Sequence, residues 1–355
     1  LAMLGLVTAA NLLALFVFWE LTSISSYLLI GFRHEERESQ EAALQALLVT
    51  GAGGLALLAG FLLIGQVYGS LSLAAIEAEP RRLLSHPCYG WAVGLILVGA
   101  FAKSAQCPFH FWLPRAMVAP TPVSAYLHSA TMVKAGIYLL ARLSPVLGGS
   151  AGWQAALLAV GGLTMLLGAW RALRQHDLKA ILAYTTISTL GMMVVLVGLG
   201  TAEAVQAALA TLIGHALYKG ALFLIAGAIE HETGTRDVRL LGGLWPHGRA
   251  LALTAALAAL SMAGLPPTFA FLAKELGYAS ALGWQATRWA AGLLALVLLP
   301  ANACNVALAL VLGYRVFFGA ARGPWPRKPH GGYRLLVLAP GLLAGLCWLA
   351  GMVPG

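Results

Sequence analysis

Long apolar stretches separated by short polar segments run along the whole chain. Those of helical length predict spans at residues 1–9, 11–32, 42–65, 88–107, 121–142, 153–170, 178–199, 203–229, 250–282, 287–318 and 333–352. A transmembrane helix needs about 20 mostly apolar residues, so the pattern predicts an all-α polytopic membrane protein with about ten transmembrane helices.

Two of these spans are interrupted by prolines. The span at 88–107 has a broken continuation to 118 that contains Pro108 and Pro114, and the span at 250–282 contains Pro266 and Pro267. Proline removes a helical hydrogen bond and clashes with the preceding turn. Irregular backbone at membrane depth is tolerated where it is buried in protein or lines a water-filled cavity. We therefore expect two broken helices beside an ion path.

A short internal echo suggests two repeats. Residues 22–26 (T-S-I-S-S) resemble residues 185–189 (T-T-I-S-T), five spans later and hence in the opposite orientation. Together with the two broken spans, this predicts two inverted five-helix repeats, as in many secondary transporters. The expected domains are 1–145, a first repeat truncated at its N-terminus, 150–320, a second repeat, and 321–355, a linker with an additional transmembrane helix. The serines and threonines could equally serve close helix packing or line water.

Composition agrees with a membrane protein. Hydrophobic residues make up 60% of the chain and charged residues 10%, against about 25% charged in soluble domains. The four cysteines form no C-x-x-C pair, so we expect neither a metal site nor a disulfide framework. No phosphate-binding loop, nucleophile–base arrangement or haem spacing is present. We therefore expect no cofactor and no enzymatic chemistry in this chain.

Basic residues gather in the loops on one side of the predicted membrane. They are Arg33, Arg37, Arg115, Arg171, Arg174, Lys179, Arg236, Arg239, Arg249, Arg315, Arg322, Arg327, Lys328 and Arg334. The other side carries Arg81, Arg82, Arg142 and Arg288. By the positive-inside rule, the loops that follow Phe32, Trp170, Ile229 and Phe318 are expected to be cytoplasmic. The net charge of +9 is explained by topology, with no nucleic-acid partner.

The remaining basic residues are four lysines inside spans: Lys103, Lys134, Lys219 and Lys274. A charge at the centre of a bilayer costs roughly 2.5 kcal/mol or more. Glu20 lies deep in an apolar span without an adjacent cation. We expect Glu20 and Lys103 to lie in contact, so that each supports the other's charge. Such a pair is either a coupling device or a static ion pair that fixes helix packing.

Histidines accompany the lysines. His215 and Lys219 are four residues apart and share a helix face, and His128 precedes Lys134 by six residues. Histidine and buried lysine both titrate near neutral pH. Since Glu20 and Glu275 are the acids available in these spans, structural pairing of all the lysines is hard to arrange. We predict a proton relay, with members Glu20, Lys103, His128, Lys134, His215, Lys219 and Lys274; the role of His110 stays open.

Six segments carry a family resemblance. They are F-W-E-L-T-S-I-S-S-Y-L-L-I-G-F (18–32), F-A-K-S-A-Q-C-P-F-H-F-W-L-P (101–114), A-P-T-P-V-S-A-Y-L-H-S-A-T-M-V-K-A-G-I-Y (119–138), D-L-K-A-I-L-A-Y-T-T-I-S (177–188), H-A-L-Y-K-G-A-L-F (215–223), and M-A-G-L-P-P (262–267) with F-L-A-K-E (271–275). In these segments the sequence resembles the antiporter-like membrane subunits shared by respiratory complex I and Mrp-type multisubunit Na+/H+ antiporters. The stretch H-E-T-G-T-R-D-V-R-L-L-G-G-L (231–244) is most similar to the large A subunit of the Mrp-type antiporters.

This resemblance implies two inverted five-helix repeats, a pair between Glu20 and Lys103, and a hydrophilic axis formed by the other relay residues. It also implies partner subunits in the same membrane and no bound cofactor. At 268–270, Thr-Phe-Ala replaces the family's usual stretch containing Asn-Gly. The chain begins inside an apolar stretch, so we expect it to be a fragment that lacks N-terminal helices.

The expected function is therefore that of an ion-translocating subunit of a multisubunit Na+/H+ antiporter in the plasma membrane. One alternative is an L-like, proton-pumping membrane subunit of NADH-quinone oxidoreductase or a related hydrogenase complex. A structural membrane scaffold is a third possibility, which the unpaired lysines disfavour. The expected partners are other membrane subunits, H+, Na+ and the lipid bilayer. The identity of the cation depends on the resemblance alone.

Overall fold

The computed structural model describes residues 1–284, 289–320, 324–329 and 333–353, and in these ranges every named element is a helix. Two isolated bridges, Asn11 with Ser72 and Asp177 with Asp237, are the extended pairings found there. The all-α prediction is thus confirmed. Arg288 and Arg322, which were assigned to loops, lie outside the described residues.

The helices begin and end close to the predicted spans. In the first half they are α1 (Ala2–Thr8), α2 (Leu12–Ile30), α3 (Arg37–Tyr68), α4 (Leu73–Ala78), α5 (Tyr89–Lys103), α6 (Trp112–Arg115), α7 (Thr121–Ala125) and α8 (Ala135–Leu147). In the second half they are α9 (Ala151–Leu173), α10 (Leu178–Gly198), α11 (Ala202–Thr233), α12 (Arg249–Ala263), α13 (Phe269–Leu282), α14 (Ala290–Leu310), α15 (Val316–Phe318) and α16 (Tyr333–Met352).

Among the described residues, eight helical segments are long and apolar enough to cross a membrane, and α5 and α12 are shorter apolar helices. Several of these helices follow an N-cap residue whose side chain accepts a hydrogen bond from the backbone N–H three residues later. The N-cap residues are Asn11 for α2, Asp177 for α10 and Thr201 for α11. Such N-caps satisfy donors that the first helical turn leaves without a partner. Local sequence therefore sets where these membrane helices start.

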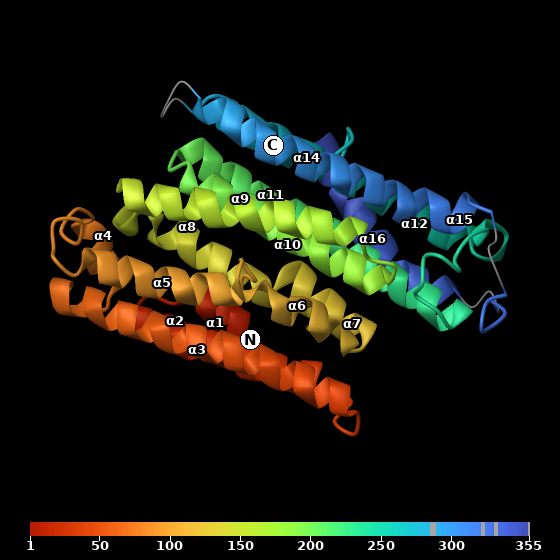
Figure 1. The fold of residues 1–355 in the computed structure, drawn as a ribbon, viewed down its shortest axis with the longest axis horizontal. Coiled ribbons are helices and arrows are strands. Elements are labelled where there is room, and N and C mark those ends of the chain that lie inside the picture. Colours follow the sequence, from red (N-terminus) through yellow and green to blue (C-terminus); the bar gives the residue numbers. More distant parts are fainter. Residues whose placement is uncertain (285–288, 321–323, 330–332, 354–355) are drawn as a thin grey trace.

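The helices lie side by side and cross the molecule roughly in chain order (Figure 1). The first helices lie along one flank and α14 along the other, with α9, α10 and α11 between them. Nearly every residue of α10 is buried, which fits a helix that is apolar all round and packed on all sides. The interior of the protein is therefore centred on α10 and its neighbours α9 and α11.

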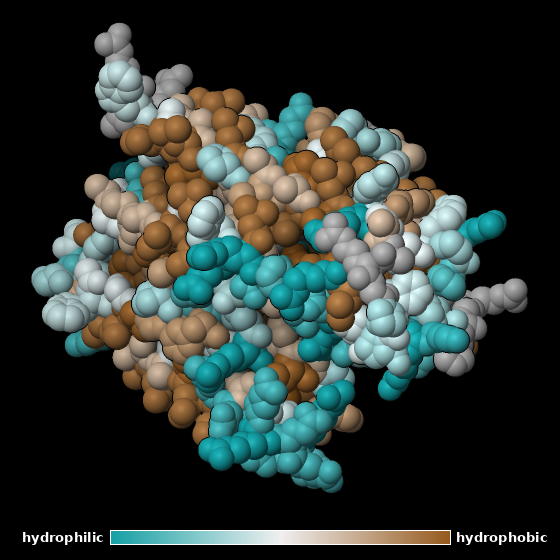
Figure 2. All heavy atoms as spheres, turned by 45° about the vertical axis from the view of Figure 1, so that its right-hand side comes forward, coloured by the Kyte–Doolittle hydropathy of each residue, from teal (hydrophilic) through white to brown (hydrophobic). Residues whose placement is uncertain are grey.

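Charged loops gather at one end of the helix bundle. The turn between α2 and α3, the segment after α11 and the described residues that follow α15 all lie at the right-hand end of Figure 1. In Figure 2, where this end comes forward, hydrophilic side chains gather across the middle of the face between hydrophobic regions. Many leucines on the flanks are exposed, including Leu55, Leu296 and Leu349. This distribution suits a bundle whose sides face lipid.

Both predicted breaks are present. Helix α5 ends at Lys103, and the chain continues through a turn into the short 3-10 helix η1 (Phe109–Phe111), α6 and η2 (Ala116–Val118). Helix α12 ends at Ala263, where Gly264 takes the left-handed conformation with φ 76°, and α13 begins at Phe269 behind the cap Thr268. A third irregularity, not predicted, is the π-helical turn η3 (Tyr126–Ala130) between α7 and α8.

Candidate functional site

Lys103 is fully buried at the last position of α5. Its ammonium donates to the carbonyl oxygen of Trp19 at 3.0 Å and to Ser23 Oγ at 2.6 Å, both on α2. Its Nζ also lies 5.2 Å from the centroid of the Trp19 ring. Because α5 ends here, the lysine side chain reaches across to the neighbouring helix. The structure thus places Lys103 against the turn of α2 that contains Glu20.

Glu20 does not form the expected direct ion pair with Lys103. No ion pair within 4.0 Å joins them among the described side chains, although they lie near enough to interact electrostatically. The reason is geometric. Lys103 donates to the carbonyl oxygen of Trp19 and to the hydroxyl of Ser23, on either side of Glu20 in the sequence. One carboxylate oxygen of Glu20 instead lies against Gly54 of α3. That oxygen, Oε1, is buried and has no hydrogen-bond partner in the part of the chain that the structure describes. Ser23 lies between the two charged groups.

Lys134 and two histidines meet at the centre of the bundle. Lys134 Nζ lies 2.9 Å from His215 Nδ1 on α11 and donates to the carbonyl oxygen of His128 at 2.9 Å. His128 belongs to the π-helical turn, which departs from the regular backbone bonding of an α-helix. Its ring centroid lies 6.4 Å from the ring centroids of Trp112 and of Phe223, and neither of its buried nitrogens has a hydrogen-bond partner among the described residues. Three members of the predicted relay are therefore in one cluster.

Lys219 lies one turn after His215 and is fully buried. Its ammonium donates to the hydroxyl of Thr185 and, at 3.3 Å, to the carbonyl oxygen of Leu182, both on α10. Thr185 belongs to the stretch that resembles residues 22–26, and the carbonyl and hydroxyl that hold Lys103 belong to the corresponding part of α2. In each half of the chain, a buried lysine is therefore held by a backbone carbonyl and a neighbouring hydroxyl.

Lys274 occupies the second broken helix. Its Nζ donates to the carbonyl oxygens of Met262 at 3.0 Å and Ala263 at 2.8 Å, which end α12, and to Asn302 Oδ1 on α14 at 2.6 Å. The adjacent acid, Glu275, is exposed on α13 and forms no ion pair with it. Glu275 therefore does not neutralise Lys274. The ammonium group of Lys274 is instead hydrogen-bonded to two carbonyl oxygens that the helix break leaves free and to the side-chain amide of Asn302.

Lys179 was expected in a loop, and this expectation is wrong. It lies in the first turn of α10 and is 2% exposed. It donates to the carbonyl oxygen of Ala119 at 3.0 Å and lies 3.9 Å from Glu230 Oε2. The reason is that Asp177 caps α10, so the helix already includes Lys179 and places it inside the bundle. Among the described residues, Lys179 is thus a buried lysine like Lys103, Lys134 and Lys219, whereas Lys274 is partly buried. Lys179 lies at the charged end of the axis.

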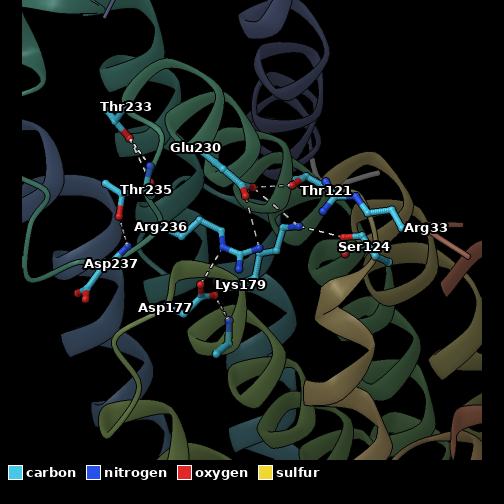
Figure 3. Close-up of polar contacts among 12 residues, drawn as sticks. Arg33, Thr121, Ser124, Asp177, Lys179, Glu230, Thr233, Thr235, Arg236 and Asp237 are labelled. Carbon is cyan, nitrogen blue, oxygen red and sulfur yellow. Dashed lines mark hydrogen bonds and ion pairs between the residues drawn. The ribbon is translucent and has the colours of Figure 1, made fainter. Parts of the chain in front are cut away.

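Around Lys179, a network of charges links three segments of the chain (Figure 3). Arg236 lies 2.8 Å from Asp177 and 3.6 Å from Glu230, and Thr121 at the start of α7 donates to Glu230 at 3.4 Å. In the same loop, hydrogen bonds from Arg239 hold the pKa of Asp237 down at about 2. Glu230 lies near the end of α11. The fold makes it the centre of this network.

Two hollows flank this network. One, of about 520 Å³, is lined by acids of the α2–α3 turn, and the other, of about 580 Å³, reaches Lys179, Gly234 and Pro340. Arg33, Val118, Glu230 and Arg236 line both. The network therefore forms the partition between two openings at the charged end.

The site as a whole is rich in buried cations and poor in anions. In the described part of the chain, no carboxylate lies within 4.0 Å of Lys103, Lys134, Lys219 or Lys274. No group of three or more His, Cys, Asp or Glu residues in that part is placed to hold a metal ion. His110, half-buried on η1, has no hydrogen bond to these residues in the described ranges, and its Nδ1 is buried without a partner. Lysines and histidines at hydrogen-bond distance can hold and pass protons.

Known membrane antiporter subunits are similar to this chain in sequence. The A/B subunit of a probable K(+)/H(+) antiporter from Rhizobium meliloti is 45% identical over 99% of this chain and 35% of its own length. The A subunit of a Na(+)/H(+) antiporter from Bacillus subtilis is 47% identical over 79% of this chain and 36% of its own length. This chain therefore spans about a third of the length of these relatives.

Solved structures show the same fold. A chain in the Mrp complex from Dietzia sp. DQ12-45-1b superposes with a TM-score of 0.88 at 39% identity, over 98% of this chain and 38% of that one. A chain of the membrane-bound sulfane sulfur reductase, an archaeal respiratory membrane complex, superposes with a TM-score of 0.83 at 25% identity, over 99% of this chain and 71% of that one. Residues 9–299 match the family described as NADH:quinone oxidoreductase/Mrp antiporter, transmembrane. The chain is thus a polytopic membrane protein that belongs to the NADH:quinone oxidoreductase/Mrp antiporter family.

Proposed function

We propose that this chain is the ion-translocating part of one subunit in a multisubunit cation/proton antiporter. In this proposal protons move along Glu20, Lys103, His128, Lys134, His215, Lys219 and Lys274. The contact of 2.9 Å between Lys134 Nζ and His215 Nδ1 carries the proposal. Two groups that both become cationic on protonation repel each other at this distance, so they share one proton rather than hold two. Such a contact is a point of proton transfer.

We take the exchanged cation to be Na+, as in the name of the Bacillus subtilis relative. The Rhizobium meliloti relative is named for K+, so the experiment below must include both ions. Lysine ammonium groups bind no cation, and Glu20 is the carboxylate of the axis. The cation pathway is therefore expected to depend on carboxylates near the ends of the axis or on partner subunits.

The proposed setting is a complex with other membrane subunits in the plasma membrane. The charged end of the bundle, with the loops after Phe32, Trp170, Ile229 and Phe318, is proposed to face the cytoplasm by the positive-inside rule. The two inverted repeats, 1–145 and 150–320, followed by a linker and one further helix at 321–355, remain our proposal for the domain organisation. The two lysine-bearing broken helices support it.

A second candidate is a proton-pumping, L-like subunit of NADH-quinone oxidoreductase or a related hydrogenase complex, in which redox chemistry in other chains drives the same axis. The close superposition on a chain of an archaeal respiratory complex favours this alternative. The higher identity to antiporter subunits favours the first candidate.

The test is cation-driven proton exchange in membrane vesicles that contain the complete assembly. We expect Na+ or K+ to collapse a preset pH gradient, and Lys219→Ala, Lys103→Ala and Glu20→Ala to reduce that rate by about 10²-fold or more, the usual contribution of a proton-transferring side chain. Arg37→Ala, at an exposed position of the charged end, is the matched control.

Normal exchange in the three variants, with the complex assembled at its usual level, would show that the buried charges serve packing. If no cation drives exchange but NADH or hydrogen oxidation drives proton uptake, the second candidate replaces the first.

A further inference from the structure

Helix α14 carries two asparagines into the membrane interior. Asn302 and Asn305 are three residues apart, so they lie on the same face of the helix. Asn302 Oδ1 accepts from Lys274, and Asn305 Oδ1 is buried without a hydrogen-bond partner among the described residues. Burying an amide without a partner is costly. Helix α14 otherwise presents apolar or small side chains, so these two amides call for a physical explanation.

Asn302 completes the environment of the Lys274 ammonium. An ammonium group has three N–H donors, and three acceptors surround Lys274 Nζ: the carbonyl oxygens of Met262 and Ala263, and Asn302 Oδ1. The two carbonyls belong to the end of α12 and are fixed by the backbone. Asn302 is the acceptor on a side chain and comes from a different helix. The charged form of Lys274 is therefore held without a carboxylate and depends on one amide.

Asn305 faces a small cavity between Lys274 and the central cluster. The cavity has a volume of about 20 Å³ and is lined by Asn302, Asn305, Lys274, His215 and Ser188, among others. Within the described ranges, three buried polar atoms of its lining residues have no hydrogen-bond partner: His215 Nε2, Ser188 Oγ and Asn305 Oδ1. A water molecule needs roughly 10–15 Å³ and two to four polar partners. The cavity satisfies both requirements.

We propose that Asn302 and Asn305 are positioning residues for proton transfer between Lys274 and His215. Asn305, with Ser188, holds a water molecule in the cavity, and Asn302 controls the release of the proton from Lys274. This inference rests on the proposed relay. It adds two residues of α14 that are not members of the relay, because their side chains carry no charge.

The transfer step conserves atoms and charge. Lys274 Nζ gives a proton to the bound water while that water gives one of its own protons to His215 Nε2. Before the step, Lys134 is neutral and His215 carries its ring hydrogen on Nδ1, so Nε2 is free to accept. After the step, Lys274 is neutral, His215 carries the positive charge, and the water is regenerated. The remaining N–H groups of Lys274 still donate to the carbonyls of Met262 and Ala263, so the Asn302 contact is the one that must open.

Asparagine suits both tasks because its amide has donors and an acceptor. It can bind the water in either orientation, before and after the proton passes. An aspartate at 302 would hold the Lys274 charge too strongly for easy release. A leucine at either position would keep the volume and remove the polar contact.

The first test compares Asn302→Leu with Asn302→Asp in the assembled complex, measuring exchange as a function of pH. Loss of an acceptor favours neutral Lys274, so Asn302→Leu is expected to move the pH profile of exchange about one unit toward acid. The added carboxylate of Asn302→Asp favours the charged form and is expected to move the profile toward alkaline pH. A structural defect would lower the rate without opposite shifts.

The second test fills the water site. Asn305→Leu is expected to lower the maximal exchange rate about 10-fold without shifting its pH profile, because it interrupts the path and leaves Lys274 in place. Asn305→Ser keeps a hydroxyl and is expected to recover most of that loss. Val306→Ala, on the exposed face of the same helix, is the control.

The results separate this inference from the relay itself. Unshifted pH profiles for both Asn302 variants, or a full rate for Asn305→Leu, would overturn the role of α14 if Lys219→Ala still abolishes exchange in the same vesicles. Normal exchange in Lys219→Ala would instead overturn the relay on which this inference rests.

Discussion

At the scale of single residues, the four lysines of the proposed relay are held by neutral oxygens rather than by acids. Backbone carbonyls or hydroxyls contact Lys103, Lys134, Lys219 and Lys274, each by at least one hydrogen bond. Neutral acceptors stabilise an ammonium less strongly than a carboxylate does. A lysine held in this way can lose its proton more readily than one in an ion pair, as a relay requires.

Ser23 illustrates how one hydroxyl can couple two charges. It accepts from Lys103 at 2.6 Å and lies beside Glu20. We expect Ser23→Ala to reduce cation-driven exchange about 10-fold, because a hydrogen bond to a charged group contributes roughly 1.5–3 kcal/mol. The measurement is proton exchange in vesicles that contain the assembled complex.

Ser25 supplies the control for this prediction. It lies on the exposed face of the same helix, where its hydroxyl donates to the carbonyl oxygen of Leu21. Ser25→Ala should leave exchange unchanged. Equal effects of the two substitutions would show that Ser23 matters for helix packing alone.

The lysines and histidines of the candidate site could be predicted from the sequence because charged groups in apolar spans are conspicuous. Lys179 could not, since it follows a helix-capping aspartate and looks like a loop charge. Asn302 and Asn305 carry no charge, so hydropathy gives no reason to single them out. Ser23 was recognised as polar, but packing and water-lining could not be separated without the position of Lys103.

At the scale of elements, α2 and α3 approach each other closely at Gly54. A methyl group on Gly54 would occupy the position of the Glu20 carboxylate, whereas one on Gly51 would meet no atom within 4 Å. We expect Gly54→Ala to displace Glu20 and to lower exchange as much as Glu20→Ala does, with the assembly intact. Exchange in vesicles and the amount of assembled complex are the measurements.

Gly51→Ala, three residues earlier in α3, is the matched control. Replacing glycine by alanine inside a helix stabilises it by about 0.5–1 kcal/mol, so this variant should assemble and exchange normally. Undiminished exchange in Gly54→Ala would mean that the position of Glu20 is not critical.

Helix positions could be predicted well because apolar runs, capping residues and prolines are local signals. Pro266 and Pro267 marked the second break, and the structure shows that Thr268 caps the following helix despite the departure from the family pattern. The π-helical turn at Tyr126–Ala130 has no comparable residue signature, because it is defined by backbone bonding to neighbouring turns. Which helices surround α10 also depends on tertiary packing that periodicity does not encode.

At the scale of the whole molecule, the charged end and the opposite end should lie on different sides of the membrane. After replacement of the native cysteines, we expect Arg81→Cys to react with a membrane-impermeant maleimide on intact cells. Glu38→Cys, at the charged end, should react only after the cells are permeabilised. The physical reason is that loops rich in Lys and Arg are retained in the cytoplasm during insertion.

The reverse labelling pattern would invert the proposed topology, and labelling of both positions on intact cells would contradict a single spanning orientation. Arg81 belongs to the segment between α4 and α5, and Glu38 to the first turn of α3. Figure 1 shows the segment after α4 and the start of α3 at opposite ends of the bundle. Labelling of each variant in permeabilised cells controls for reactivity.

The axis of lysines and histidines crosses neighbouring helices instead of following one of them. His128 and Lys134 lie near the middle of the segment Thr121–Leu147, and His215 and Lys219 near the middle of α11. In the proposed relay, a proton passed among these residues would travel in the plane of the bilayer, whereas the membrane potential falls along the bilayer normal. Crossing the full potential is worth about 2.3 kcal/mol per 100 mV for each elementary charge. We therefore expect the membrane potential to change the rates of proton uptake from the hollows and of proton release. We expect it to have no effect on proton transfer between residues of the axis, because they lie at the same electrical potential.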